Sequence, residues 1–318
     1  MAAYKIPDTP TRNATSHEFA DYLELLCIVN GGEYSISDAQ SQIDIISDED
    51  DQEGIMNEDD LLYDSLQNSL EEIDHRHISC AGHYPFTSDR NRIIFDAGQD
   101  IIEQKRALVY QYLLLATRLN MIDHKIVEDI DGTLLFEEIS ALAVKNYFGS
   151  NAESLIFGTA TQGGFKDKIS QLILKLGEGS EAKEPEESTN DERDGGLDVV
   201  AWRPFADKRK GKMIGFGQCK TGTTWRMQVG LLDPDDFCKT YFKDQPISKP
   251  ISLFFVAESF KENYESIFRK AGIMFDRCRI MEQLSDVPDE LITRIQKWIN
   301  GNMLIVQEAY SIAGITRI

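Results

Sequence analysis

The sequence lacks long apolar runs, a leader pattern and a regular set of cysteines. No apolar stretch reaches the roughly 18 residues that a membrane-spanning helix needs, so we expect no membrane segment. The N-terminal stretch MAAYKIPDTPTRNATSHEF has no charged-then-apolar pattern, so we expect no secretion. Five scattered cysteines, an odd number, favour a reduced cytoplasmic protein over a disulfide scaffold.

Basic residues are also scarce. The chain of 318 residues has 33 Lys and Arg against 54 Asp and Glu, a net charge of −21. Residues 1–120 alone hold 23 acidic and 8 basic residues. This balance excludes a protein that simply coats DNA with a basic surface, but it is compatible with an enzyme that has a local basic strip. The acidic excess is either a solvated surface or a module that meets a protein partner or shields a site.

The first 120 residues read as a mainly helical domain. Hydrophobic spacing and end signals predict helices over 15–32, 59–74 and 99–120, and a short strand over 92–96. We interpret 1–120 as an acidic regulatory or partner-binding domain, able to contact a protein partner or a second copy of the chain.

Residues 121–318 predict a mixed α/β core. Helical and strand patterns follow one another as helix, strand, helix, two paired strands, strand, helix, strand and helix. Strands whose residues do not alternate between apolar and polar should be central in the sheet and covered on both faces. The predicted helices are 131–149, 164–179, 264–272 and 287–312, and the predicted strands are 154–160, 197–202, 213–219, 250–258 and 273–281. The polar segment 178–196 reads as a mobile loop.

Polar residues gather on the two paired strands. Asp198 begins the first, and Gln218 and Lys220 lie two residues apart on the second, so both point to one face. Cys219 points to the other face, but its backbone carbonyl is available. Neighbouring strands hold side chains about 5 Å apart. A divalent cation used in phosphodiester cleavage prefers such oxygen ligands, and a nearby lysine favours an ionised water and balances the developing oxyanion.

The stretches GGLDVVAW and GFGQCK resemble the PD-(D/E)xK nuclease superfamily, in the D…QxK form of its Mrr-like branch. GTLLFEEIS is similar to the helix with an acid that this branch places before the core. The resemblance covers roughly residues 122–290. It implies a restriction-endonuclease-like mixed sheet with flanking helices, Mg²⁺ or Mn²⁺ as cofactor, DNA as substrate, and a bacterial restriction or anti-phage defence role.

The resemblance also assigns roles to residues. Asp198 would be the metal-bridging carboxylate and Lys220 the catalytic lysine. Gln218 would stand in the place of the usual second acid, which removes one negative charge. Glu137 would complete the metal site together with the Cys219 carbonyl, with Glu138 as its substitute.

Each of these residues also has an ordinary structural interpretation. Asp198 could be a turn or cap residue, and Lys220 a strand-end lysine whose stem covers apolar surface. Gln218 could simply be hydrogen-bonded, and Glu137 and Glu138 could both lie on a solvated helix face.

The only dense basic run is DKRKGK at 207–212, between the two paired strands. It is either a solvated hairpin tip or a phosphate-contacting loop beside the active site. On the second interpretation the nucleic-acid contacts are Lys208, Arg209, Lys210, Lys212 and Arg226.

A second cluster, DHRHISCAGH, contains His75, His77, Cys80 and His83. Zinc sites usually pair two ligands on each of two separated segments. One compact group without a second half is more typical of a loop, although zinc binding stays an alternative.

The sequence as a whole predicts a metal-dependent endonuclease that cleaves DNA. One alternative is a catalytically inactive nuclease fold that binds nucleic acid or a protein. Another is an enzyme of the same fold that acts on RNA or branched DNA.

Overall fold

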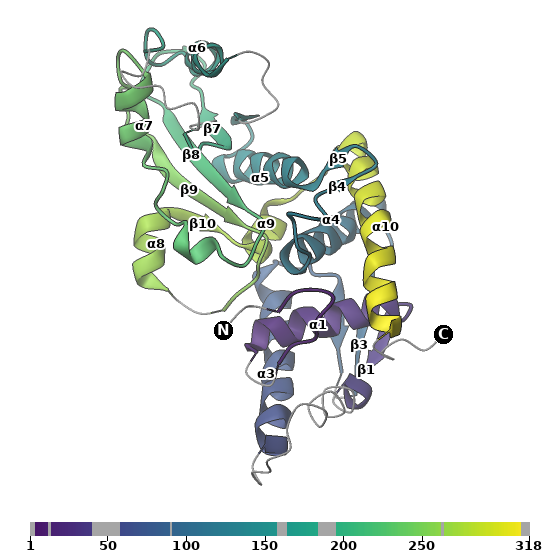
Figure 1. The fold of residues 1–318 in the computed structure, drawn as a ribbon. Coiled ribbons are helices and arrows are strands. Elements are labelled where there is room, and N and C mark those ends of the chain that lie inside the picture. The colour runs from purple at the N-terminus through teal and green to yellow at the C-terminus, as the bar shows by residue number, and fades with distance from the viewer. Residues whose placement is uncertain are drawn as a thin grey trace.

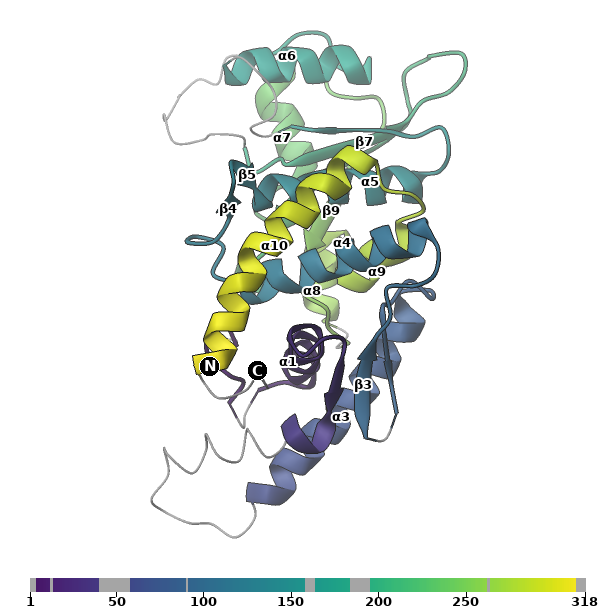
Figure 2. The same cartoon turned by 90° about the vertical axis from the view of Figure 1, so that its right-hand side faces the viewer.

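The computed structural model describes residues 4–11, 14–39, 58–89, 91–157, 164–183, 195–261 and 264–312. The larger sheet has five strands. Figure 1 shows this sheet in one half of the molecule and the first helices of the chain in the other. Two long helices, α4 (Ile101–Arg118) and α10 (Asp289–Ile312), lie between the halves and pack on each other (Figure 2). Most of the predicted loop 178–196 lies outside the described residues.

The sheet is mixed, as the sequence predicts. Its strand order is β10-β9-β8-β7-β6. The pairs β6–β7 and β7–β8 are antiparallel, whereas β8, β9 and β10 run parallel. The strands are β6 (Glu153–Ile156), β7 (Val199–Arg203), β8 (Met213–Lys220), β9 (Ile251–Val256) and β10 (Ile273–Phe275).

Helices cover both faces of the sheet. Helix α5 (Gly132–Phe148) packs on β6 and β7 from one side. Helices α6 (Phe165–Leu176) and α7 (Pro234–Tyr241) share a hydrophobic cluster with the residues of β7 and β8 that point to the other side. Helix α8 (Glu265–Ala271) contacts β9 and β10. A mixed α/β fold is therefore confirmed.

One predicted strand is partly wrong. The apolar pattern over 273–281 predicts a strand, but β10 ends at Phe275 and α9 (Arg277–Gln283) follows at once. The Asp276 carboxylate accepts a hydrogen bond from the backbone N–H of Arg279 at 2.9 Å. This N-cap begins a helix inside the apolar run, and periodicity over so few residues does not separate the two structures. Helix α7 is a further element that the sequence reading did not predict.

Glycines allow α5 to approach the centre of the sheet. A Cβ atom on Gly215 would lie 2.6 Å from Leu253 and 3.0 Å from Phe148, and one on Gly217 would lie 2.7 Å from Phe255. No larger residue fits at either position without displacing these side chains. The last turn of α5 therefore packs closely on β8, just before the strand reaches its polar end.

The N-terminal half agrees with the predicted helices but adds a small sheet. Helices α1 (Ser16–Val29) and α3 (Glu58–Ser79) match the predicted ones in place, as does α4. The predicted strand near 92 is β3 of a three-stranded antiparallel sheet with order β1-β3-β2. Its strands are β1 (Glu33–Ser35), β2 (Phe86–Ser88) and β3 (Arg92–Phe95), and a two-stranded hairpin, β4 (Ile126–Val127) and β5 (Ile130–Asp131), follows α4.

Packing is continuous across residue 120, where we predict a domain boundary. One hydrophobic cluster contains side chains of α1 and α4 together with side chains of α5, α9 and α10. The rings of Tyr112 and Trp298, for example, meet edge to face at 5.1 Å. The two-domain division stays a prediction. Among the helices that the structure describes, none is both long and apolar enough to cross a membrane.

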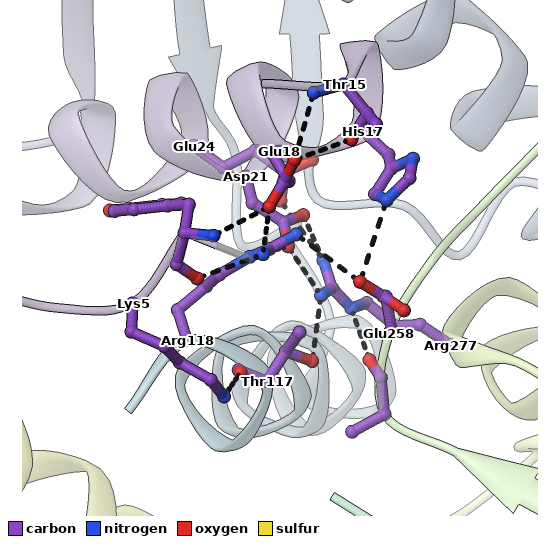
Figure 3. Close-up of polar contacts among 12 residues, drawn as sticks. Lys5, Thr15, His17, Glu18, Asp21, Glu24, Thr117, Arg118, Glu258 and Arg277 are labelled. Atoms are coloured by element: carbon purple, nitrogen blue, oxygen red, sulfur yellow. Dashed lines mark hydrogen bonds and ion pairs between the residues drawn. The ribbon is translucent and has the colours of Figure 1, made fainter. Parts of the chain in front are cut away.

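A buried ionic network joins the two halves (Figure 3). Asp21 of α1 lies at its centre and accepts hydrogen bonds from Arg76 at 2.7 Å, Arg118 at 2.7 Å and Arg277 at 2.8 Å. All four side chains are fully buried. Because Arg277 belongs to α9, which follows the sheet, the network connects the N-terminal helices directly to the core.

Candidate functional site

The predicted site residues lie where two inner strands of the sheet, β7 and β8, meet at their ends. We call this end of the strands the site edge. Asp198 directly precedes β7, and Gln218 and Lys220 lie in the last three residues of β8. The register pairs Val199 with Gly217, so the start of β7 and the end of β8 meet at this edge. Asp198 and Lys220 are both half-buried, a setting in which charged groups remain reachable from solvent.

Asp198 is anchored to the backbone of β8. Its carboxylate Oδ2 accepts a hydrogen bond from the Cys219 N–H at 2.7 Å. Its own carbonyl accepts from Phe157 at 2.8 Å, and its N–H donates to Gly217 at 2.9 Å. In an antiparallel pair, the N–H and C=O of one residue point toward the same neighbouring strand. The Cys219 carbonyl is therefore directed to the side where Asp198 lies.

Glu137 of α5 acts on the side chain of Cys219, which points to the face of β8 opposite to Gln218 and Lys220. Burial raises the pKa of the Cys219 thiol, and the negative charges of Asp198 and Glu137 raise that pKa further, while Lys220 acts in the opposite sense. All three charged groups are thus close enough to Cys219 to act on it. The thiol stays protonated at neutral pH, so Cys219 offers its backbone oxygen and not a thiolate.

The structure separates Glu137 from Glu138. Arg294 of α10 donates hydrogen bonds to both carboxylate oxygens of Glu138, with Nη1 2.6 Å from Oε1. Glu138 and Arg294 both line an open pocket of about 480 Å³ between α5, β6 and α10. Glu138 is held in this ion pair, whereas Glu137 acts on the charge state of Cys219, so Glu137 stays the candidate acid of α5.

Gln218 is buried, with 4% of its surface exposed. Its side-chain Oε1 has no hydrogen-bond partner within the described part of the chain. Its Nε2 approaches Gly196, where a Cβ atom would lie 3.4 Å away. Leaving a buried polar atom unpaired costs about 1–3 kcal/mol, and such atoms usually have a water or an ion as partner. Gln218 is therefore suited to present an oxygen to a cation.

The basic hairpin loop is not beside these residues, which corrects one expectation. The register pairs Arg203 with Met213, so the loop begins where Asp198 and Lys220 are farthest away. Seven residue steps along β8 correspond to about 23 Å. Lys208, Arg209 and Lys210 are exposed on this loop, and Arg209 pairs with Asp207 at 2.7 Å.

Lys212 differs from the rest of the basic run. It is only 6% exposed, and its ammonium donates a hydrogen bond to the Leu176 carbonyl at 2.6 Å, at the end of α6. A cation at a helix C-terminus is favourable. Because the buried ammonium of Lys212 already pairs with this carbonyl, Lys212 is not available for the predicted phosphate contact.

Arg226 lies at the site edge, in a short 3-10 helix (Trp225–Met227) after β8. Its guanidinium carbon is 4.5 Å from the centroid of the buried Trp225 ring, and its Nη1 is 3.1 Å from Glu258 Oε2. The sequence reading did not single out Glu258. The available signal was an acid directly after the apolar run ISLFFVA, at the end of a parallel strand.

The histidine and cysteine cluster lies at the end of α3 and just after it. His75 and His77 are helical, which corrects the loop interpretation for them. His75 Nε2 is 3.2 Å from the Ser79 hydroxyl, and His83 Nδ1 is 2.9 Å from the Met281 carbonyl. Across the ranges that the structure describes, no three His, Cys, Asp or Glu side chains come together as a ligand group, either in this cluster or at the ends of β7 and β8.

No protein-family model matches the sequence, and neither the curated proteins nor the solved structures contain a match. The geometry at the ends of β7 and β8 is therefore the observation that bears on function.

Proposed function

We propose that the protein is a metal-dependent endonuclease that hydrolyses DNA phosphodiester bonds. The observation that supports this proposal is the Asp198–Cys219 contact of 2.7 Å, with Lys220 next in the chain and Glu137 of α5 acting on Cys219. A mixed sheet with helices on both faces is the architecture that a restriction-endonuclease-like core requires. All five cysteines are free thiols, which supports a cytoplasmic location.

The donor atoms at this edge fit Mg²⁺, or Mn²⁺ in its place. Asp198, Glu137, the Cys219 carbonyl and the buried Gln218 Oε1 supply only oxygen, the ligand that these cations prefer. A bound cation would polarise the phosphate and lower the pKa of a water. The set contains two carboxylates, so we expect weak binding of a single cation that DNA strengthens.

The remaining chemistry belongs to the side chains. Lys220 shares the face of β8 that carries Gln218, and its ammonium is placed to balance negative charge on the phosphate oxygens in the transition state. Asp198 holds the backbone of Cys219 in place and so fixes the direction of its carbonyl. Arg226, half exposed at the same edge, is placed to contact a neighbouring phosphate.

Incubation of the full chain with supercoiled and linear DNA tests this proposal. We expect nicking or cleavage with Mg²⁺ or Mn²⁺, no product in EDTA, and recovery of activity when the metal is added back. Product that forms equally well in EDTA would contradict a metal-dependent site.

A nuclease fold without activity, which binds nucleic acid or a protein partner, is a second candidate. The observation that favours it is Gln218, a neutral side chain at the position where the resemblance expects an acid. This candidate predicts DNA or protein binding that does not depend on Mg²⁺ and does not change when Lys220 is replaced by alanine.

A further inference from the structure

Glu258 is a buried carboxylate at the edge where β8 and β9 end. It follows β9 by two residues, and Val256 at the end of β9 pairs in register with Lys220. The backbone N–H of Ala257 donates to the Lys220 carbonyl at 3.3 Å. Only 1% of Glu258 is exposed. This acid therefore belongs to the immediate surroundings of the candidate catalytic lysine.

One oxygen of Glu258 holds the segment that follows Lys220. Oε2 accepts hydrogen bonds from Trp225 Nε1 at 2.6 Å and from Arg226 Nη1 at 3.1 Å. The Arg226 guanidinium also stacks on Trp225, and the Tyr264 ring lies 5.3 Å from it. These contacts fix the direction of the guanidinium. They leave 31% of the side chain exposed, enough for a planar group that pairs with phosphate oxygens.

The other oxygen of Glu258 faces the N-terminal half (Figure 3). Oε1 is 3.6 Å from His17 Nε2 of α1 and 3.8 Å from Arg118 Nη2 of α4. Arg118 is itself held by Asp21. Burial by itself would raise the pKa of Glu258, but the contact with His17 and the charges of Arg118 and Arg226 outweigh it and lower the pKa to about 2. Glu258 is therefore an anion at neutral pH.

We infer that Glu258 is a positioning residue that holds Arg226 beside Lys220 for contact with the DNA backbone, and that His17 and Arg118 hold Glu258 in turn. The N-terminal helices thus support the substrate-binding surface from inside the fold, and a change in their packing alters how the chain binds DNA. The contact between Arg226 and DNA rests on the proposed function, whereas the positioning of the Trp225–Arg226 segment does not.

Hydrogen–deuterium exchange of the full chain tests the positioning without DNA. Glu258→Gln keeps the shape of the side chain but removes its charge. We expect amides in residues 221–231 to exchange roughly tenfold faster, because charge-assisted hydrogen bonds are weakened. His17→Gln, which keeps Glu258 itself, should accelerate the same peptides to a smaller extent. Glu265→Gln, a change at an exposed acid of α8, is the matched control. Unchanged exchange over 221–231 in both variants overturns the inference.

DNA affinity tests the role of Arg226. Glu258→Gln and Arg226→Gln should each weaken duplex binding and raise KM more than they lower kcat. Each should also reduce the slope of log affinity against log salt by about 1. The double variant should bind no more weakly than either single variant, since both changes remove one contact. Additive losses overturn the coupling of Glu258 to Arg226. A wild-type chain that neither binds nor cleaves DNA overturns the proposed function, while exchange over 221–231 still decides the positioning.

Discussion

Replacing Lys220 by alanine should lower the single-turnover rate of DNA cleavage by about 10²–10³-fold, the usual cost of removing one donor to transition-state charge. Lys220 ends β8 next to Cys219, whose N–H is held by Asp198. Two strands therefore fix the backbone that carries this proposed catalytic side chain. The rate is measured with saturating enzyme and Mg²⁺, so that product release does not contribute.

Lys297→Ala is the matched control, because Lys297 is an exposed lysine of α10 and its loss should leave the rate unchanged. Duplex affinity should fall only slightly in Lys220→Ala, since the interaction strengthens in the transition state. A variant that retains the wild-type rate would contradict the assignment of Lys220. A variant that loses affinity and rate equally would make Lys220 a binding residue.

Replacing Asp21 by alanine should destabilise the protein by about 3–5 kcal/mol, the cost of leaving buried charges without their partner. Three fully buried arginines, Arg76, Arg118 and Arg277, donate to this one carboxylate. Without it, Glu24 and Glu72 remain as acids that contact Arg76, at 2.7 Å and 3.1 Å, and burial raises the pKa of Glu24. Urea unfolding followed by circular dichroism measures the change.

The contribution of Asp21 to the free energy of unfolding should depend on pH. Burial by itself would raise the pKa of Asp21, but the charges of the three arginines outweigh it and hold the pKa far below its ordinary value. A group with a lowered folded-state pKa stabilises the protein above its unfolded pKa, about 3.9, and loses that contribution as the pH falls. The difference in the free energy of unfolding between wild type and Asp21→Asn should therefore be constant near neutral pH and become smaller below about pH 4. Asp8→Asn, at an exposed position, is the control, and a difference that grows toward acid pH would contradict the account.

The local pattern of the candidate site could be predicted from the sequence. Strand alternation and the spacing of Asp198, Gln218 and Lys220 depend on neighbouring residues only, whereas the register of β7 and β8 is set in the folded sheet. The spacing of residues does not separate Glu137 from Glu138, and only the resemblance favours Glu137. The ion pair that occupies Glu138 comes from Arg294, which lies far along the chain and leaves no periodic trace near α5.

Most of the other features that could not be predicted from the sequence are long-range ion pairs. Glu258, Arg118 and Arg277 are ordinary charged residues in their own segments, and only the folded chain brings them together. The expectation that the basic run 207–212 lies beside the site was wrong for a related reason. Its composition suggested a phosphate-binding loop beside the site, but the hairpin register places it at the far end of the strands, and Lys212 turns inward to the end of α6.

The central claim is that a metal-dependent site lies at the ends of β7 and β8 and takes one acid from α5. Single-turnover DNA cleavage in Mg²⁺ by Glu137→Gln and Glu138→Gln, measured beside wild type, tests it most directly, because the two changes are chemically identical and adjacent. We predict that Glu137→Gln loses about 10²-fold or more in rate and needs more Mg²⁺ for half-maximal activity. Glu138→Gln, which breaks only the ion pair with Arg294, should cleave at nearly the wild-type rate. Equal rates for the two variants, or a larger loss in Glu138→Gln, would contradict the site.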